Sequence, residues 1–279
     1  MDWQGVPVLV TGAGGFIGIH LVEELVERGA DVRAFVRYNS RQDIGLLQLV
    51  PQEKRRRVEV IAGDLRDVEA VAQATQGVGV VFHLGALISI PYSYLHPREV
   101  VETNVLGTLN ILMAARACQV DKIIHTSSSE VYGTARSVPM AEDHPLQGQS
   151  PYSASKISAD KIAESFYRSY ALPVATIRPF NTYGPRQSAR AVIPTIITQA
   201  LTMDRVLLGE LSTRRDFTYV SDVVAAFLQA AESQACVGQV INIGSGEDIS
   251  IGDLARKIIA LVGREVEIVA DKRDRKSVV

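Results

Sequence analysis

Cysteine is scarce in this chain, since only Cys118 and Cys236 occur among 279 residues. Two widely separated cysteines fit neither a disulfide framework nor a metal-ligand spacing, so we expect no metal site and two buried thiols in a reducing compartment. An excess of one charge is also lacking, because 29 Lys and Arg nearly balance 31 Asp and Glu. A net charge of −2 supplies no basic field for nucleic acid or an anionic membrane.

Long hydrophobic runs are missing as well. The apolar stretch 6–10 is too short for a signal peptide and continues directly into a glycine-rich loop. No apolar run approaches the ~20 residues that a membrane span needs, so we expect a cytoplasmic protein without a membrane partner. Hydrophobic residues still make up 47% of the chain, which is enough to bury the core of one large domain or two packed ones.

Apolar strands and amphipathic helices alternate through the first half of the chain. Strands are predicted at 6–10, 32–36, 58–61, 80–83, 122–125 and 174–177, and helices at 16–28, 68–75, 98–118 and 152–170. Continuous apolar strands separated by helices are typical of a parallel sheet covered on both faces. We therefore predict an α/β fold, a Rossmann-like doubly wound sheet, with residues 1–180 forming an NAD(P)-binding domain.

The alternation breaks after Arg178, where proline and glycine interrupt the chain. Shorter helices are predicted at 192–201, 221–231 and 250–262. We expect 181–279 to form mainly a smaller C-terminal α/β substrate-binding lobe, with 216–245 partly returning to the first domain.

A glycine-rich turn follows the first predicted strand. Gly12, Gly15 and Gly18 permit a tight turn, a close approach of the backbone to a pyrophosphate, and close packing of helix on strand. The helix that begins at Phe16 and Ile17 directs free N–H groups and its positive dipole end towards phosphate. Because a strand precedes the turn and a helix follows it, dinucleotide binding is a better reading than an ordinary turn.

The end of the second strand carries no acidic residue for the 2′-hydroxyl of NAD. Arg37 and Arg41 stand there instead and could face a 2′-phosphate, which favours NADP, although NAD and a purely solvated role stay open. After the third strand, Asp64 could accept a hydrogen bond from the adenine amino group or cap the following helix.

A tyrosine and a lysine share one face of the helix predicted at 152–170. Ser150 and Pro151 suit the N-cap and the first helical position, which places Tyr152 and Lys156 four residues apart in the first turns. A free phenol titrates near pH ~10, and we expect the neighbouring ammonium to lower the pKa of Tyr152 so that it can accept a proton. Alone, this spacing is a weak signal.

Hydroxyl side chains and one acid follow the fifth strand, at Ser127, Ser128, Ser129 and Glu130. In an open parallel sheet ligands bind beyond the carboxyl ends of the strands, so these groups should point to the site. Serines also occur in such loops to satisfy the backbone, but that does not explain the glutamate.

Together these motifs resemble the extended short-chain dehydrogenase/reductase family of nucleotide-sugar enzymes. The resemblance runs from about residue 6 to residue 262 and is carried by TGAGGFIG, GDL, SSSEVYG, YSASK and RPFNTYGPR. It implies a tightly bound NAD(P), a nucleotide-sugar substrate and a homodimer that pairs the helices at 98–118 and 152–170. The implied catalytic residues are Tyr152, Lys156, Ser128, Glu130 and Ser129. The implied cofactor contacts are Gly12, Gly15, Phe16, Ile17, Gly18, Arg37, Asp64, Leu65, Leu84, Gly85, Asn104, Ser127, Tyr152, Lys156 and Pro179.

The same resemblance implies substrate contacts at Ser89, Tyr92, Asn181, Arg186, Arg190 and Arg215. An arginine fork fits phosphate oxygens, so Arg186 and Arg215 would hold the nucleotide diphosphate. An ion pair with Asp216 or Asp222 is the alternative for Arg215. In relatives one or two further helices usually follow a segment like 269–272. Here 273–279 follow instead, so we expect either a shortened C-terminus or missing residues, and either would affect part of the nucleotide-binding wall.

The resemblance implies oxidation of the sugar at C4, after which subfamilies diverge into 4-epimerases, 4,6-dehydratases and decarboxylases. Dehydratases and decarboxylases tend to carry a glutamate two residues after the catalytic hydroxyl, where Glu130 stands. Ser129 replaces the aspartate of deoxythymidine-type dehydratases, so the GDP-mannose type is more similar. The segments 88–94 and 188–194 resemble bacterial N-acetylglucosamine-nucleotide 4,6-dehydratases. We expect a dehydratase acting on a GDP- or UDP-linked hexose for bacterial surface-glycan or deoxysugar synthesis. A 4-epimerase is the alternative, and a non-catalytic dinucleotide sensor is a remote one, since sensors typically lose the Tyr-Lys pair.

Overall fold

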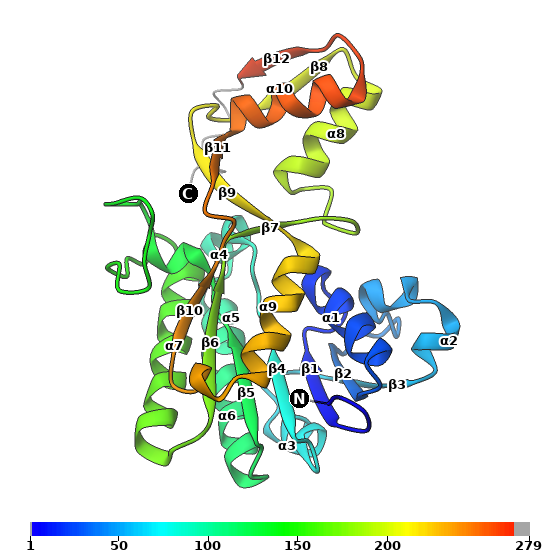
Figure 1. The fold of residues 1–279 in the computed structure, drawn as a ribbon, viewed down its shortest axis with the longest axis vertical. Coiled ribbons are helices and arrows are strands. Elements are labelled where there is room, and N and C mark those ends of the chain that lie inside the picture. Colours follow the sequence, from blue (N-terminus) through cyan, green and yellow to red (C-terminus); the bar gives the residue numbers. More distant parts are fainter. Residues whose placement is uncertain (1, 271–279) are drawn as a thin grey trace. The chain divides into compact units, whose positions relative to one another are not determined.

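The computed structural model describes residues 2–270 and divides the chain into two compact units (Figure 1). The first comprises Met1–Pro179 and Val220–Ile243, and the second comprises Phe180–Tyr219 and Gly244–Val279. The chain therefore leaves the first unit after β6 and returns to it for one helix and one strand. The C-terminal stretch 273–279 lies outside the described residues.

A parallel sheet of seven strands forms the centre of the first unit, in the order β10-β6-β5-β4-β1-β2-β3. Its strands are β1 (Pro7–Thr11), β2 (Asp31–Arg37), β3 (Val58–Gly63), β4 (Val80–His83), β5 (Lys122–Thr126), β6 (Val174–Pro179) and β10 (Val240–Ile243). The Rossmann-like prediction is confirmed, and the predicted strands differ from the observed ones by no more than two residues at either end. The strand order reverses between β1 and β4, which is where such sheets bind their ligands.

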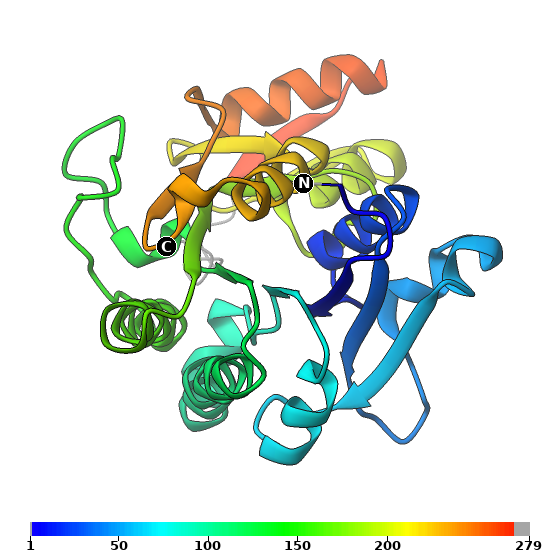
Figure 2. The same ribbon diagram turned by 60° about the horizontal axis from the view of Figure 1, so that its bottom comes forward.

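Helices cover both faces of this sheet, as Figure 2 shows. The core on one face contains α1 (Phe16–Glu27) and α9 (Val220–Glu232), and the core on the other contains α3 (Val68–Thr75), α6 (Gly107–Ala117) and α7 (Pro151–Tyr170). The strands read as continuous apolar runs because they are buried on both sides. Short elements join these pieces, at η1 (Gly45–Leu49), α2 (Gln52–Arg55), α4 (Ile90–Leu95), η3 (Ser129–Tyr132) and η4 (Gln234–Cys236).

The helix predicted at 98–118 contains a distortion that its sequence pattern does not reveal. It consists of α5 (Pro97–Val101), a π-helical turn η2 (Glu102–Leu106) and α6. The wider turn surrounds Asn104, whose buried side chain bonds to a loop and to another helix. Such turns are frequent at functional sites.

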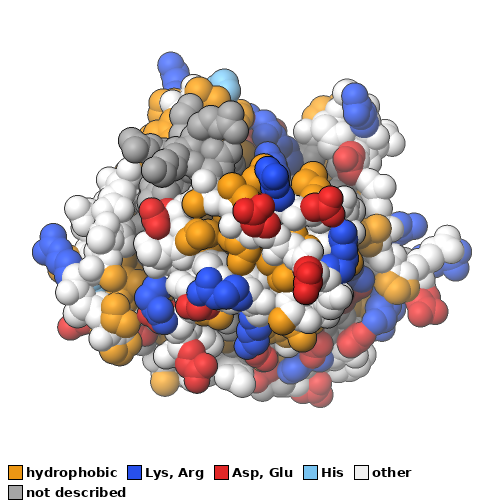
Figure 3. Space-filling model, turned by 90° about the horizontal axis from the view of Figure 1, so that it is seen from above, with side chains coloured by type: hydrophobic (Ala, Val, Ile, Leu, Met, Phe, Trp, Pro, Cys, Tyr) orange, Lys and Arg blue, Asp and Glu red, His pale blue; other side chains and the backbone are white. Residues whose placement is uncertain are grey.

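The second unit has its own small core. β7 (Asn181–Tyr183), β9 (Arg214–Tyr219) and β11 (Asp248–Ser250) form one sheet, and β8 (Arg205–Leu208) pairs in parallel with β12 (Glu267–Ala270). α8 (Val192–Thr202) and α10 (Ile251–Val262) supply apolar side chains to this core and match the predicted helices closely. Basic, acidic and hydrophobic side chains are interspersed on the face seen in Figure 3. Within residues 2–270, no helix is both long and apolar enough to cross a membrane.

Candidate active site

The glycine turn between β1 and α1 is shaped for close backbone contact. Gly12 has a φ of +69°, and a Cβ there would lie 2.8 Å from the backbone nitrogen of Gly85. A Cβ at Gly18 would lie 2.3 Å from the carbonyl oxygen of Gly12. Gly15 is the N-cap of α1 and makes no side-chain cap, so the first N–H groups of the helix, at Phe16 and Ile17, remain available to phosphate oxygens. These residues fit the pyrophosphate of a dinucleotide.

A buried relay of hydrogen bonds links this turn to the loop after β4. The Gly85 N–H donates to the Thr11 hydroxyl, which lies 2.8 Å from Nδ1 of His83. Nε2 of His83 lies 3.0 Å from the Thr108 hydroxyl, and that hydroxyl donates to the carbonyl of Asn104. Because the Thr108 hydrogen is used there, His83 donates through Nε2 and accepts at Nδ1. Burial lowers the pKa of His83 well below its ordinary value, so the ring is neutral.

Leu84, Gly85, Leu65 and Pro179 are packed around the carboxyl edge of the sheet. Leu84 and Gly85 follow β4 and are half-buried, and Pro179 is the buried last residue of β6. The buried Leu65 leaves no room for a side chain at position 85, since a Cβ there would lie 2.8 Å from the Leu65 Cδ1. A side chain at position 85 would therefore require Leu65 to shift.

Arg37, at the end of β2, is not free to face a 2′-phosphate as predicted, because it forms an ion pair. The Arg37 guanidinium donates to Glu99 at 3.0 Å, and the Tyr92 hydroxyl donates to the other oxygen of the same carboxylate. Asp64 pairs with Arg66 at 2.6 Å, and Asp67, not Asp64, caps α3. The predicted lean towards NADP therefore loses its main support, and the helix-cap reading of Asp64 is wrong.

Tyr152 and Lys156 lie on the first turns of α7, as predicted. Ser150 is the N-cap, Pro151 occupies the first turn, and a capping box joins Ser150 to Ser153. Tyr152 is 6% exposed and Lys156 4%. The Lys156 ammonium donates to the carbonyl oxygen of Thr126 at 2.5 Å, which directs it to the carboxyl end of β5.

The predicted lowering of the Tyr152 pKa is wrong for this structure. Burial raises the pKa of Tyr152 to about 12, a hydrogen bond with Ser128 lowers it, and the charges of Glu130 and Asp160 raise it further. Burial lowers the pKa of Lys156 to about 8, although the charge of Asp160 raises it. The sequence argument considered only the neighbouring charge, whereas desolvation penalises the charged form of both groups.

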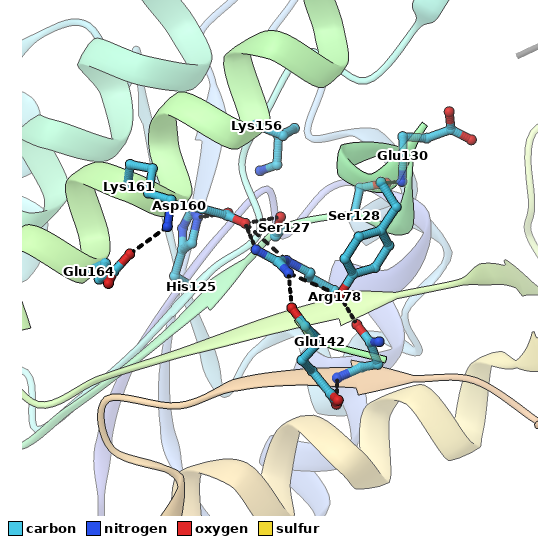
Figure 4. Close-up of polar contacts among 12 residues, drawn as sticks. His125, Ser127, Ser128, Glu130, Glu142, Lys156, Asp160, Lys161, Glu164 and Arg178 are labelled. Atoms are coloured by element: carbon cyan, nitrogen blue, oxygen red, sulfur yellow. Dashed lines mark hydrogen bonds and ion pairs between the residues drawn. The ribbon is translucent and has the colours of Figure 1, made fainter. Parts of the chain in front are cut away.

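A buried polar network surrounds Asp160, which lies one turn further along α7 than Lys156 (Figure 4). The Asp160 carboxylate accepts hydrogen bonds from His125 at 3.1 Å, from the Ser127 hydroxyl at 2.8 Å, and from the Arg178 guanidinium at 3.0 Å. His125 and Arg178 are both at least 97% buried, with 0% and 3% exposure. Burial raises the pKa of Asp160, but the bonds and charges of His125, Arg178 and Ser127 outweigh this and keep it below the ordinary value. Asp160 therefore remains an anion beside Lys156.

The network continues through Arg178 to β10. Arg178 donates to the Tyr132 hydroxyl at 2.9 Å, and Tyr132 donates to the side chain of Asn242 on β10 at 2.7 Å. The backbone N–H of Asn242 donates to Glu142 at 2.9 Å. This chain of contacts holds the loop that separates η3 from α7. Ser127 belongs to the same network through its hydroxyl, which donates to Asp160.

Ser128 and Glu130 occupy the turn that follows β5. The Ser128 hydroxyl caps η3 by accepting the N–H of Glu130 at 3.2 Å, and its neighbour Ser129 is the first residue of that turn. Glu130 is half-buried, and in Figure 4 its carboxylate points away from the Asp160 network. Its negative charge raises the pKa of Tyr152. The turn therefore carries a hydroxyl that hydrogen-bonds the phenol and a carboxylate whose charge acts on it.

Asn104 connects the loop after β4 to α7. Its side-chain oxygen accepts the N–H of Leu87, and its amide donates to the Leu87 carbonyl and to the Ser155 hydroxyl. Ser155 in turn donates to the backbone carbonyl of Tyr152. Each of these contacts is with the protein itself, which gives Asn104 a positioning role. Ser89, one of the predicted substrate contacts, caps α4.

Four of the predicted substrate contacts belong to the second unit. Asn181 begins β7 and donates to the backbone carbonyl of Asp216 at 3.2 Å. Arg186 has a φ of +69° and Arg190 is exposed. Arg215 donates to the carbonyl of Arg214 at 2.9 Å. The Asp216 carboxylate accepts instead from Ser245 and Gly246, so the alternative of an Arg215–Asp216 ion pair does not describe this part of the chain.

Sequence reasoning missed His83, Glu99, Asp160 and Arg178. Asp160 could have been predicted from the sequence, because it continues the four-residue spacing of Tyr152 and Lys156 along one helix face. The others carry no local signal, since their partners come from distant elements.

The comparisons with known proteins agree with this geometry. The profile of the GDP-mannose 4,6-dehydratase family matches residues 9–279. A UDP-glucose 4-epimerase of Mycolicibacterium smegmatis is 35% identical over 261 residues, which cover 91% of this chain and 82% of the relative. A dTDP-glucose 4,6-dehydratase of Streptomyces antibioticus is 33% identical over 274 residues, 96% of this chain and 81% of the relative.

A solved structure leads to the same family. The dTDP-glucose 4,6-dehydratase DesIV of Streptomyces venezuelae, with NAD and TYD bound, superposes with a TM-score of 0.85 at 30% identity and covers 96% of this chain and 85% of its own. The fold and the site agree with these relatives. The chain has a glycine turn where the strand order of the sheet reverses, and a buried Tyr-Lys pair on one helix. The chain belongs to the extended short-chain dehydrogenase/reductase family of nucleotide-sugar dehydratases and epimerases.

Proposed function

We propose that this enzyme is an NAD-dependent nucleotide-sugar 4,6-dehydratase acting on a GDP- or UDP-linked hexose. The observation that carries the proposal is the carboxylate of Glu130, which lies in the turn that Ser128 caps and whose charge acts on Tyr152. The family profile named for GDP-mannose 4,6-dehydratase and the dehydratase relatives support it. The epimerase relative keeps a 4-epimerase as the second candidate.

The cofactor follows from the chain's own residues. The glycine turn and the N-terminus of α1 would hold the pyrophosphate, and Lys156, directed to the carboxyl end of β5, would hold the nicotinamide ribose. We propose NAD rather than the NADP first favoured, because Arg37 is engaged by Glu99 and the solved relative holds NAD. When bound, the oxidised nicotinamide supplies reversible hydride exchange and a positive charge that favours the Tyr152 phenolate.

The protein groups have separate tasks in this scheme. Ser128 orients the 4-hydroxyl of the sugar, and Tyr152 accepts its proton as C4 is oxidised to a ketone. The ketone acidifies the C5 proton, which Glu130 removes and passes to the departing C6 hydroxyl, so that this group leaves as water. C6 would then regain the hydride taken from C4 and C5 a proton from Tyr152, so the net change is the loss of one water. Asp160 helps Lys156 to stay protonated, because the negative charge of the carboxylate raises the pKa of the lysine.

The mass of the product distinguishes the two candidates. Incubation with GDP- and UDP-hexoses should give a product lighter by one water, whereas an isobaric product would establish epimerisation instead. Glu130→Gln should still oxidise C4, seen as reduced-nicotinamide absorbance, but stall before loss of water. Glu164→Gln is the matched control, because Glu164 lies on the exposed side of α7 in a pair with Lys161. Full turnover by Glu130→Gln would refute the assigned base.

We also propose a homodimer that pairs two long helices, α7 and the α5–α6 helix, with their copies in a second chain. Val101, Leu106 and Met113 are apolar side chains of the α5–α6 helix, and each is between 44% and 52% exposed. Light scattering should report twice the mass of one chain, and Leu106→Glu should shift the mass towards one chain. A monomeric parent protein would exclude this interface.

A further inference from the structure

A single carboxylate controls the charges at the carboxyl end of β2. Arg37 is the last residue of that strand, where a dinucleotide-binding sheet presents the 2′ position of the adenosine ribose. Glu99 of α5 lies 3.0 Å from the Arg37 guanidinium and is 25% exposed, whereas Arg37 is 59% exposed. The hydroxyl of Tyr92 donates to the other oxygen of Glu99. The carboxylate is therefore held on both sides and faces the guanidinium.

The neighbouring arginines are occupied in the same way. Arg66 pairs with Asp64 at 2.6 Å, and Arg98 pairs with Glu102 at 2.7 Å. Hydrogen bonds from Tyr92 and Arg37 lower the pKa of Glu99 despite its partial desolvation, so Glu99 is ionised at neutral pH. Arg37, Arg66 and Arg98 thus each have a carboxylate partner.

We propose that Glu99 is a specificity-determining residue that selects NAD over NADP by occupying Arg37 and by presenting a negative charge at the 2′ position. The proposal rests on the dinucleotide binding proposed above. A 2′-hydroxyl can donate to a carboxylate, whereas a 2′-phosphate carries about −1.5 to −2 charges and is repelled by it. The phosphate would also have to displace Glu99 to reach the arginine fork.

Removal of the charge should therefore release Arg37 for the phosphate. Glu99→Gln retains the shape of the side chain and an oxygen for the Tyr92 hydroxyl. Because Arg37 is largely exposed, its guanidinium can turn without disturbing the core. We expect the preference for NAD+ over NADP+ to fall roughly tenfold, as one like-charge contact near the surface is replaced by one opposite-charge contact.

The test is a competition that requires no sugar turnover. Purified full-length protein is equilibrated with equal NAD+ and NADP+, separated from free nucleotide and denatured, and the released nucleotides are quantified by chromatography. Glu99→Gln should raise the bound NADP+ to NAD+ ratio roughly tenfold, and the gain should shrink in high salt. Glu59→Gln is the control, because Glu59 forms a similar 2.9 Å pair with Arg33, further back on β2.

The double variant Glu99→Gln with Arg37→Gln completes the design. It should lose the gain in NADP+, because the released guanidinium is then absent. An unchanged ratio in Glu99→Gln, or a gain that persists in the double variant, overturns the role of Glu99. Binding of neither nucleotide by the parent protein would instead overturn the proposed function itself, so the two failures are distinguishable.

Discussion

Replacement of Lys156 by methionine should stabilise the fold while it abolishes activity. Lys156 is 4% exposed, and burial lowers its pKa from 10.5 to about 8. Below pH 8 the folded protein carries a desolvated ammonium that the unfolded chain holds in water. Methionine keeps most of the apolar volume and removes this charge.

The magnitude follows from the pKa difference. A shift from 10.5 to about 8, at about 1.36 kcal/mol for each unit, costs the folded state about 3 kcal/mol at pH 7. The variant also loses the hydrogen bond to the Thr126 carbonyl, which costs about 1–3 kcal/mol when a buried acceptor is left unpaired. We expect a net gain of about 1–2 kcal/mol at pH 7 for Lys156→Met.

The pH dependence identifies the cause. The folded pKa lies below the unfolded one, so the unfolded state binds more protons between pH 8 and 10.5 and the stability of the parent rises through that window. At pH 9.5 only about 1 kcal/mol of the penalty remains, and the advantage of Lys156→Met should vanish or reverse. Thermal or denaturant unfolding followed by circular dichroism at both pH values measures the difference.

The control is Lys161→Met on the same helix, because Lys161 is 61% exposed and pairs with Glu164. It should change stability by less than about 0.5 kcal/mol, equally at both pH values. If Lys156→Met were destabilised by the same amount at pH 7 and pH 9.5, desolvation of the lysine would not be the dominant effect and the reasoning would be refuted.

Other predictions test the relay, the network and the turn. Asp160→Asn leaves a buried arginine without its anion and should lower the free energy of unfolding by about 3–5 kcal/mol in denaturant titrations. Burial holds the pKa of His83 well below its ordinary value, so only the unfolded state takes up a proton as the pH falls below 6.5, and the fold loses stability. The free energy of unfolding of His83→Gln should therefore fall less between pH 7 and pH 5 than that of the parent protein. Gly18→Ala would place a Cβ 2.3 Å from the Gly12 carbonyl and should weaken dinucleotide binding at least about tenfold in titrations, whereas Gly79→Ala, with its nearest neighbour at 3.4 Å, should not.

Local patterns predicted most of the elements that carry the site. The glycines after β1 predicted a tight turn, and Gly12 has a positive φ there. Ser150 and Pro151 predicted the start of α7, and with it the shared face of Tyr152 and Lys156. Each of these features depends on residues within about one turn of one another, so the chain's own periodicity is sufficient to predict them.

The protonation states could not be predicted in the same way. From the sequence Lys156 is a cation next to a phenol, and a lowered Tyr152 pKa follows. In the structure both groups are buried, and burial moves the pKa of the phenol up and that of the lysine down. The sign of the effect depends on how much water each side chain loses, which only packing against other elements determines.

The sequence by itself determined the fold class, the dinucleotide turn and the catalytic helix, because strand and helix periods and glycine conformations are properties of neighbouring residues. Only the tertiary structure decided which charges meet. Glu99 reaches Arg37 across 62 residues of chain, and His125 and Arg178 reach Asp160 from two different strands. Coulombic and hydrogen-bond energies depend on distance in space and on local water, and neither quantity is written in the order of the residues.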